Sequence, residues 1–185
     1  MSVQEALAVI LAIAYLVLAI RENRFCWPAG IGSALLYLGV FYDAGLYMEA
    51  ALQLFYVAMG GYGWWAWRPA SSEPLTIHRW PLRRHALAIT VIAGLSVSSG
   101  WLLAHYSAAA SPYLDSFVTW SAVLTTGMVA RKLLENWLYW FVIDAVTLAL
   151  ALHSGLHLTA ALFTLYLVLV VIGWRAWFAT WRRQA

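Results

Sequence analysis

Long runs without a charged residue constrain this chain more than any other feature of its sequence. Asp, Glu, Lys and Arg are absent from whole stretches, the longest of which are residues 85–114 and 145–174. Of the 185 residues, 64% are hydrophobic and 10% are charged, whereas about 25% are charged in a soluble domain. Each membrane-spanning helix needs about 20 apolar residues. The sequence therefore predicts an all-α integral membrane domain and excludes a water-soluble enzyme, a disordered chain and a nucleic-acid-binding protein.

Turn signals divide the apolar stretches into seven helices. Ser111-Pro112 ends one helix, because proline lacks an amide hydrogen and interrupts helical pairing. Ser154-Gly155 separates the last two helices. The predicted membrane helices are 4–20, 26–42, 46–67, 86–106, 113–130, 135–153 and 157–179. Glu5 precedes the first apolar run and no basic segment does, so we expect a membrane helix there and not a signal peptide.

The eleven basic residues predict how the helices are oriented. With seven spans, all of them fall on one side of the membrane: after the first, third and fifth helices and at the end of the seventh. They are Arg21, Arg24, Arg68, Arg79, Arg83, Arg84, Arg131, Lys132, Arg175, Arg182 and Arg183. Connections rich in Lys and Arg stay in the cytoplasm. We therefore expect a multi-pass protein of the bacterial inner membrane, with its N-terminus outside and its C-terminus in the cytoplasm.

The second half of the chain resembles the first when the two are laid over each other at one constant offset. The residues that coincide without a gap include Arg21 with Arg131, Trp27 with Trp137, Tyr56 with Tyr166, Gly63-Trp64 with Gly173-Trp174, and Trp67 with Trp177. The sequence therefore predicts two three-helix repeats, 1–67 and 112–185, joined by a cytoplasmic loop and a linker helix in 68–111. A single linker span makes the repeats parallel, as in SWEET transporters, and transporters built from repeats bind substrate between them.

Two spaced motifs resemble those of the PnuC family of vitamin transporters. In the first half, the matching residues are Leu52-Gln53-Leu54-Phe55-Tyr56 and Tyr62-Gly63-Trp64-Trp65-Ala66-Trp67, similar to the family's LQxxY and YGWxxW. In the second half they are Asn136-Trp137-Leu138-Tyr139-Trp140, Tyr166 and Gly173-Trp174-Arg175-Ala176-Trp177, similar to NWxxW, Y and GWxxW. The resemblance covers nearly the whole chain. It implies a three-plus-one-plus-three fold and uptake of a vitamin-like precursor, of which nicotinamide riboside is the family's best-known example.

The third predicted helix carries the first set of candidate substrate-binding residues. Helical spacing places Glu49, Gln53, Tyr56 and Trp64 on one face. Gln53 offers two donors and one acceptor to a carboxamide, and the motif match favours this role over a helix–helix hydrogen bond. Tyr56 can stack on a flat ring or pack in the core. Glu49 and Trp64 are weaker candidates, as is Tyr166 on the last helix.

The sixth predicted helix carries the second set. Trp137, Trp140 and Asp144 share a face, and the two tryptophans can stack on a cationic ring or fill the core. Asp144 lies about 12 Å from the cytoplasmic end of its helix, at a depth where a carboxylate costs about 2.5–3.5 kcal/mol. It attracts a cation, is protonated, or locks its helix to a neighbour by a hydrogen bond. Asn136 reaches a ribose hydroxyl or caps the helix.

Several kinds of site are absent from the sequence. It contains no phosphate-binding glycine loop, nucleophile elbow or zinc-protease motif. His153 and His157 have the spacing of a metal pair, but they flank a turn and lack a third ligand. We expect no enzymatic activity, no metal and no cofactor. The expected partners are a small vitamin precursor and the lipid bilayer, and the sequence leaves a homo-oligomer such as a trimer open.

These residues favour a facilitator for nicotinamide riboside, a flat pyridinium cation with an amide and a ribose. The family resemblance implies diffusion down a gradient, with phosphorylation in the cytoplasm trapping the product. Thiamine, which is also a cation, and riboflavin are alternatives within the same family, and proton coupling through Asp144 is a variant. A different class is open too: a membrane sensor or assembly subunit, without transport activity, whose tryptophan-rich faces bind a partner helix.

Overall fold

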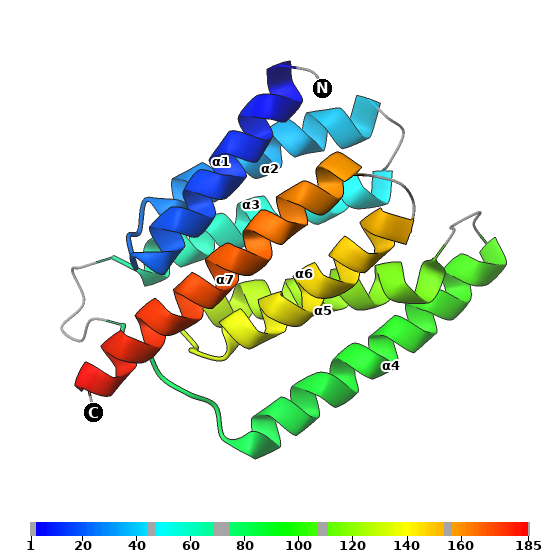
Figure 1. Ribbon diagram of the computed structural model, residues 1–185. Helices are drawn as coiled ribbons and strands as arrows, with labels where there is room; N and C mark the ends of the chain where they lie inside the picture. The colour runs from blue at the N-terminus through cyan, green and yellow to red at the C-terminus, as the bar shows by residue number, and fades with distance from the viewer. Residues whose placement is uncertain (1–2, 44–46, 69–74, 107–110, 154–156, 185) are drawn as a thin grey trace. The chain divides into compact units, whose positions relative to one another are not determined.

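The computed structural model describes residues 3–43, 47–68, 75–106, 111–153 and 157–184, and seven helices account for most of them (Figure 1). The helices are α1 Val3–Ile20, α2 Cys26–Asp43, α3 Tyr47–Ala66, α4 Leu82–Tyr106, α5 Pro112–Ala130, α6 Asn136–His153 and α7 His157–Gln184. The predicted all-α fold with seven helices is confirmed. The predicted boundaries agree with the structure to within one residue except at the start of α4 and the end of α7.

Both differences arise where a helix continues beyond its apolar part. Arg83 and Arg84 lie in the first turn of α4, and Arg182 and Arg183 lie in the last turn of α7. Arginine is a good helix former, and a cation near a helix C-terminus is stabilised by the helix dipole. A boundary drawn at the outermost apolar residue therefore makes the helix too short, at the start of α4 as well as at the end of α7.

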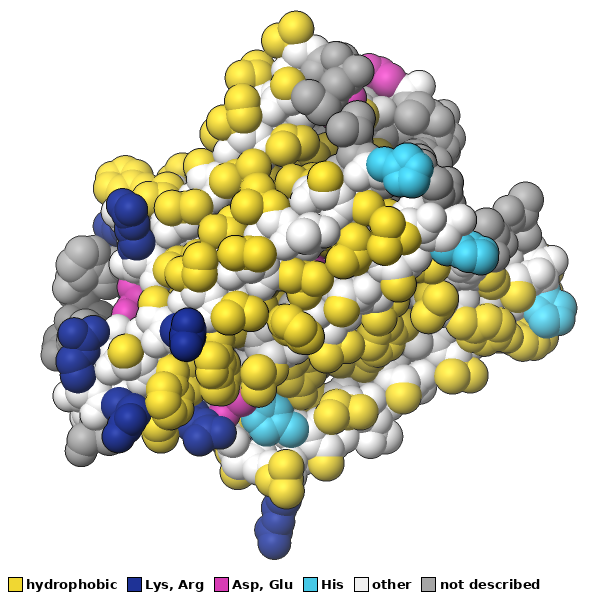
Figure 2. Space-filling view, viewed as in Figure 1, with side chains coloured by type: hydrophobic (Ala, Val, Ile, Leu, Met, Phe, Trp, Pro, Cys, Tyr) yellow, Lys and Arg dark blue, Asp and Glu magenta, His cyan; other side chains and the backbone are white. Residues whose placement is uncertain are grey.

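Four of the described helices are long and apolar enough to cross a membrane: α1, α4, α6 and residues 159–184 of α7. The helices α2, α3 and α5 have 18, 20 and 19 residues. They carry more tryptophan, tyrosine, glycine, serine and threonine, which lowers their hydropathy although such residues are common in membrane helices. That these three also span the membrane remains a prediction. On the face drawn in Figure 2, hydrophobic side chains cover the lengths of the helices.

The helices form two compact units. The first unit contains Met1–Ile77, Val129–Lys132 and Arg175–Ala185, and the second contains His78–Met128 and Leu133–Trp174. The first unit is therefore discontinuous, because the end of α5 and the end of α7 join α1, α2 and α3. The predicted segments 1–67, 68–111 and 112–185 describe a sequence repeat, and they remain a prediction.

In the first unit, tryptophan and glycine bring α2 and α3 close together. Asn23 shapes the turn before α2, because its carbonyl oxygen accepts a hydrogen bond from the Cys26 amide at 3.0 Å and its Oδ1 accepts one from the Phe25 amide at 2.9 Å. Trp27 is buried against Gly63, where a Cβ atom would overlap the indole ring. Gly60 likewise leaves room for the side chain of Ile31. Because these glycines have no side chain, α2 and α3 pack closely enough for the Trp27 ring to lie directly against α3.

In the second unit a tryptophan again packs on a glycine, here between α6 and α7. Trp137 is buried, and a Cβ atom at Gly173 would overlap its ring. The neighbouring helices α4 and α5 also meet at a glycine, since a Cβ at Gly100 would lie 2.6 Å from the ring of Tyr113. Small residues at crossing points are typical of helix packing in membranes, because they let backbones approach.

Two turns of the same geometry follow α1 and α5. Glu22 and Lys132 have positive φ angles of 54° and 52°. After α1, the amide of Asn23 donates to the carbonyl of Leu18 at 2.9 Å, and after α5 the amide of Leu133 donates to that of Met128 at 2.9 Å. This pattern is the Schellman motif, in which a left-handed residue ends a helix and satisfies its last carbonyls.

Candidate functional site

The predicted binding residues of α3 lie in the first unit. Gln53 and Tyr56 are both half-buried, and Gln53 has no hydrogen-bond partner among the residues whose side chains the structure describes. Tyr56 contacts Phe55 edge to face, with ring centroids 5.7 Å apart. Its ring and the Gln53 amide therefore remain available to a ligand. The side chain of Glu49 lies outside the described residues.

Trp64, a weaker candidate on α3, already contacts other side chains. It lies at the basic end of this unit, where Arg24 follows α1 and Arg68 follows α3. The Arg24 guanidinium lies 3.6 Å from the centre of its ring, and Phe25 contacts it edge to face at 5.5 Å. A cation over an indole ring is attracted by the electrons of the ring face. Arg24 therefore already occupies one face of this ring.

The predicted residues of α6 lie in the second unit, and Asp144 is the most unusual of them. It is 5% exposed. No hydrogen bond or ion pair joins its carboxylate to another described residue. A buried carboxylate without a partner is costly in a membrane. Among the described residues nothing supports the alternative in which Asp144 locks α6 to a neighbour by a hydrogen bond.

Asn136 begins α6 and is fully buried. Its amide nitrogen donates to the Leu133 carbonyl at 2.6 Å, whereas its oxygen Oδ1 has no hydrogen-bond partner among the described residues. The side chain thus caps the turn with one end and presents an unused acceptor with the other. A helix cap uses the side-chain oxygen as acceptor for a backbone amide, and Oδ1 makes no such bond among the described residues. The contact with a ribose hydroxyl remains a prediction.

The aromatic candidates of this unit differ in how fully they are buried by packing against neighbouring residues. Trp137 is fully enclosed against Gly173, which supports a core role. Trp140 is half-buried. Tyr166 on α7 is half-buried too and meets Phe163 edge to face, with ring centroids 5.5 Å apart. Trp140 therefore has more surface to offer a planar ligand than Trp137.

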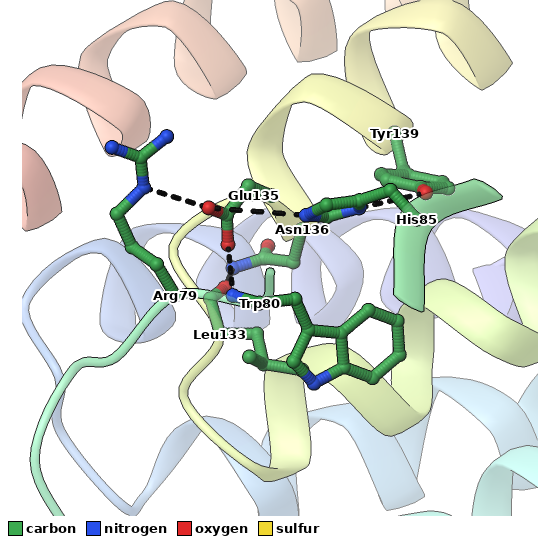
Figure 3. Close-up of polar contacts among 7 residues, drawn as sticks. All are labelled: Arg79, Trp80, His85, Leu133, Glu135, Asn136 and Tyr139. Carbon is green, nitrogen blue, oxygen red and sulfur yellow. Dashed lines mark hydrogen bonds and ion pairs between the residues drawn. The ribbon is translucent and has the colours of Figure 1, made fainter. Parts of the chain in front are cut away.

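A polar cluster that the sequence did not reveal lies beside Asn136 (Figure 3). Its centre is Glu135, a buried carboxylate that accepts a hydrogen bond from Nε of Arg79 at 2.7 Å. His85 lies on the other side, with its Nδ1 3.0 Å from the Tyr139 hydroxyl and its Nε2 3.9 Å from Glu135.

Backbone contacts join the same two segments that the side chains of this cluster join. The Leu134 amide donates to the His78 carbonyl at 2.9 Å, and His78 pairs with Leu133 as a single parallel bridge. The segment before α4 is thus fastened to the turn before α6. The only sequence signal was an acid among basic residues, which does not identify its partners.

Replacing Arg79 by glutamine should lower the melting temperature of the purified protein modestly. The Arg79 side chain is about half exposed, so the ion pair with buried Glu135 is screened by water and is worth about 1 kcal/mol or less. The loss should shrink at 1 M salt, where the Debye length is about 3 Å. Arg84→Gln makes the same charge change at an exposed position and serves as control. Equal melting curves for the two variants would contradict a stabilising role for Arg79.

The fold and these side chains define a multi-pass α-helical membrane protein. The profile of the nicotinamide mononucleotide transporter family matches residues 2–179, so the chain belongs to this family. A riboflavin/roseoflavin transporter, RibM of Streptomyces davaonensis, is 25% identical over 182 residues, covering 95% of this chain and 84% of the relative. The nicotinamide riboside transporter PnuC of Escherichia coli is 23% identical over 211 residues, covering 97% and 87%.

The fold is also that of a solved transporter. The crystal structure of the vitamin B3 transporter PnuC superimposes with a TM-score of 0.79 at 20% identity, covering 98% of this chain and 83% of the other. The resemblance to the PnuC family is thereby confirmed, and with it the membrane transport class. The relatives transport different vitamins, so family membership leaves the substrate open.

Proposed function

We propose that this protein takes up nicotinamide riboside across the bacterial inner membrane by facilitated diffusion. The observation that carries the proposal is Asp144, a buried carboxylate without a partner among the described residues. An unbalanced negative charge in a membrane helix favours a cation as ligand. Nicotinamide riboside carries a positive ring, whereas riboflavin is neutral.

Each proposed contact recognises one part of this substrate. The Gln53 amide pairs with the carboxamide, and Tyr56 and Trp140 stack on the ring. Asn136 accepts a hydrogen bond from a ribose hydroxyl through its unused Oδ1. Trp137 is the weakest member of the set, because its packing against Gly173 already accounts for its burial.

The distribution of basic residues argues against a phosphorylated substrate. Phosphate groups are typically bound by arginine or lysine, which make strong charge-assisted hydrogen bonds. In the described helices α1, α2, α3, α5 and α6 no Lys or Arg occurs, and those of α4 and α7 lie toward one end. The riboside therefore suits the chain better than the mononucleotide, and phosphorylation in the cytoplasm would keep the product inside.

Riboflavin is the second candidate, because the relative RibM matches this chain at 25% identity. Thiamine remains a third, since it shares the positive charge on which the proposal rests. Uptake of the three labelled vitamins into proteoliposomes separates them. We expect saturable uptake of nicotinamide riboside, inhibited weakly or not at all by riboflavin. Saturable uptake of riboflavin alone would overturn the proposal.

We also propose that the chain is a parallel three-plus-one-plus-three repeat. Two observations support it beyond the coincidences of sequence. The Schellman turns at Glu22 and Lys132 stand at matching positions of the two copies and make the same hydrogen bonds. The packing of Trp27 on Gly63 recurs at the matching positions of the second copy as Trp137 on Gly173.

A fluorescent protein fused to the C-terminus should glow in bacterial cells, because the basic ends of the helices are expected in the cytoplasm. The matched fusion carries alkaline phosphatase, which is active only outside the inner membrane and should be inactive here. An active phosphatase fusion with no fluorescence would refute the predicted combination of an outside N-terminus with an odd number of spans.

A further inference from the structure

Two tryptophans of the first unit cap the ends of helices that are distant in sequence. The indole Nε1 of Trp67, directly after α3, donates to the Ala130 carbonyl at the end of α5, at 3.1 Å. The indole Nε1 of Trp177 on α7 donates to the Ala19 carbonyl at the end of α1, at 3.0 Å. The last carbonyls of a helix lack partners within it. The Trp67 indole therefore satisfies the Ala130 carbonyl. The Trp177 indole adds a second hydrogen bond to the Ala19 carbonyl, which also accepts from the Glu22 amide at 3.0 Å.

The four elements also meet through the side chains between these bonds. The rings of Trp67 and Trp177 lie 6.1 Å apart. The Lys132 ammonium lies 5.0 Å from the Trp67 ring and pairs with Glu22 at 2.9 Å. Both tryptophans are buried, so water has little access to the two indole hydrogen bonds. Hydrogen bonds and ion pairs are stronger where water is excluded.

We propose that Trp67, Trp177, Glu22 and Lys132 form a latch that holds the basic end of the first unit closed. The ends of α5 and α7 are fastened to α1 and α3 at this point by side chains, not by a short connection. Separation at this end breaks both indole hydrogen bonds together and leaves the Ala130 carbonyl without its indole partner. The physiological meaning rests on the proposed transport, in which substrate must leave toward the cytoplasm. The latch itself is tested without substrate.

Cys26 provides a reporter for the state of the latch. It is the chain's single cysteine and is fully buried at the first position of α2. The next residue, Trp27, contacts the Trp67 ring edge to face, with centroids 5.5 Å apart. A thiol at this place reacts with a small reagent only when the packing around Trp67 opens. The rate of its alkylation therefore follows the fraction of molecules that are open.

The test measures alkylation of Cys26 by N-ethylmaleimide in the purified full-length protein. Trp67→Phe and Trp177→Phe keep an aromatic ring and remove the N–H donor. Each should raise the alkylation rate about tenfold, the factor that corresponds to about 1.4 kcal/mol. Trp65→Phe is the matched control, because Trp65 is 55% exposed on the same helix and should leave the rate unchanged. Rates equal to the wild type in both latch variants would overturn the proposal.

A charge exchange tests the latch independently of the tryptophans. Glu22→Lys places two cations together and should raise the alkylation rate, and adding Lys132→Glu should lower it again. Gel filtration and melting curves identify variants that have lost their fold. Failure of the second change to restore protection, in a folded double variant, would also count against the latch. Transport assays on the wild type are separate, so a wrong substrate and an absent latch give different results.

Discussion

Replacing Asp144 by asparagine should weaken the binding of nicotinamide riboside by about ten- to a hundredfold. The substitution keeps the size of the side chain and removes its charge. A hydrogen bond or contact with a charged partner in a protein is worth about 1.5–3 kcal/mol, which corresponds to that loss of affinity. The effect should be large because Asp144 is buried and has no other partner among the described residues. Binding titrations with the purified protein measure it.

The same riboside with a reduced, uncharged ring distinguishes the explanations for Asp144. If the carboxylate attracts the cationic ring, the reduced analogue should bind both proteins almost equally. Asp43→Asn makes the same charge change at an exposed position near the other end of a helix and is the control. Equal losses for both ligands, together with a lower melting temperature, would mean that Asp144 stabilises the fold. No loss for either ligand would mean that Asp144 is protonated at rest.

Replacing Gln53 by alanine should reduce affinity for the riboside by about 5- to 150-fold. The expected cost is that of leaving a ligand amide unpaired in a buried site, about 1–3 kcal/mol. Gln53 has no hydrogen-bond partner among the described side chains, so its removal should not disturb a helix contact. Titration with the riboside and with an analogue that lacks the carboxamide measures the effect, which should be confined to the former.

Leu54→Ala is the matched control for Gln53→Ala. Leu54 is the next residue of α3 and is 56% exposed, so its truncation tests the helix without touching the proposed contact. Normal affinity in a correctly folded Gln53→Ala protein would show that Gln53 does not bind the substrate. Loss of folding in Gln53→Ala but not in Leu54→Ala would assign Gln53 to helix packing.

Most of the fold was predictable because one physical rule dominates a chain of this composition. Long uncharged runs fix the existence of membrane helices, and proline or glycine marks their limits. The extension of α4 over Arg83 and Arg84 was not predictable on that basis, since hydropathy reports membrane depth and not helicity. The close approach of α2 and α3 was also hidden, because nothing in a sequence shows that Trp27 faces Gly63.

The site was predictable only in part. The motif carrying Gln53 and the isolated acid Asp144 stand out in sequence, because polar residues are rare in membrane helices. The contacts that separate Trp137 from Trp140 depend on the side chain opposite each of them, and both residues belong to the same sequence motif. Glu135 was missed altogether, since its partners Arg79 and His85 lie much earlier in the chain, before α4 and within it. Such pairs are made by tertiary structure and have no local pattern.

The first unit cannot be completed until α7 has been synthesised. Ala19 precedes its donor Trp177 by 158 residues, which a ribosome adds in about 10–30 s at roughly 5–20 residues per second. During this time α1, α2 and α3 are already made, while the carbonyl of Ala19 has not met its indole partner. A chain that stops before α7 therefore presents an unfinished bundle to the proteases that remove incompletely folded proteins. In this architecture the end of α1 gains its indole partner only after α7 has been made.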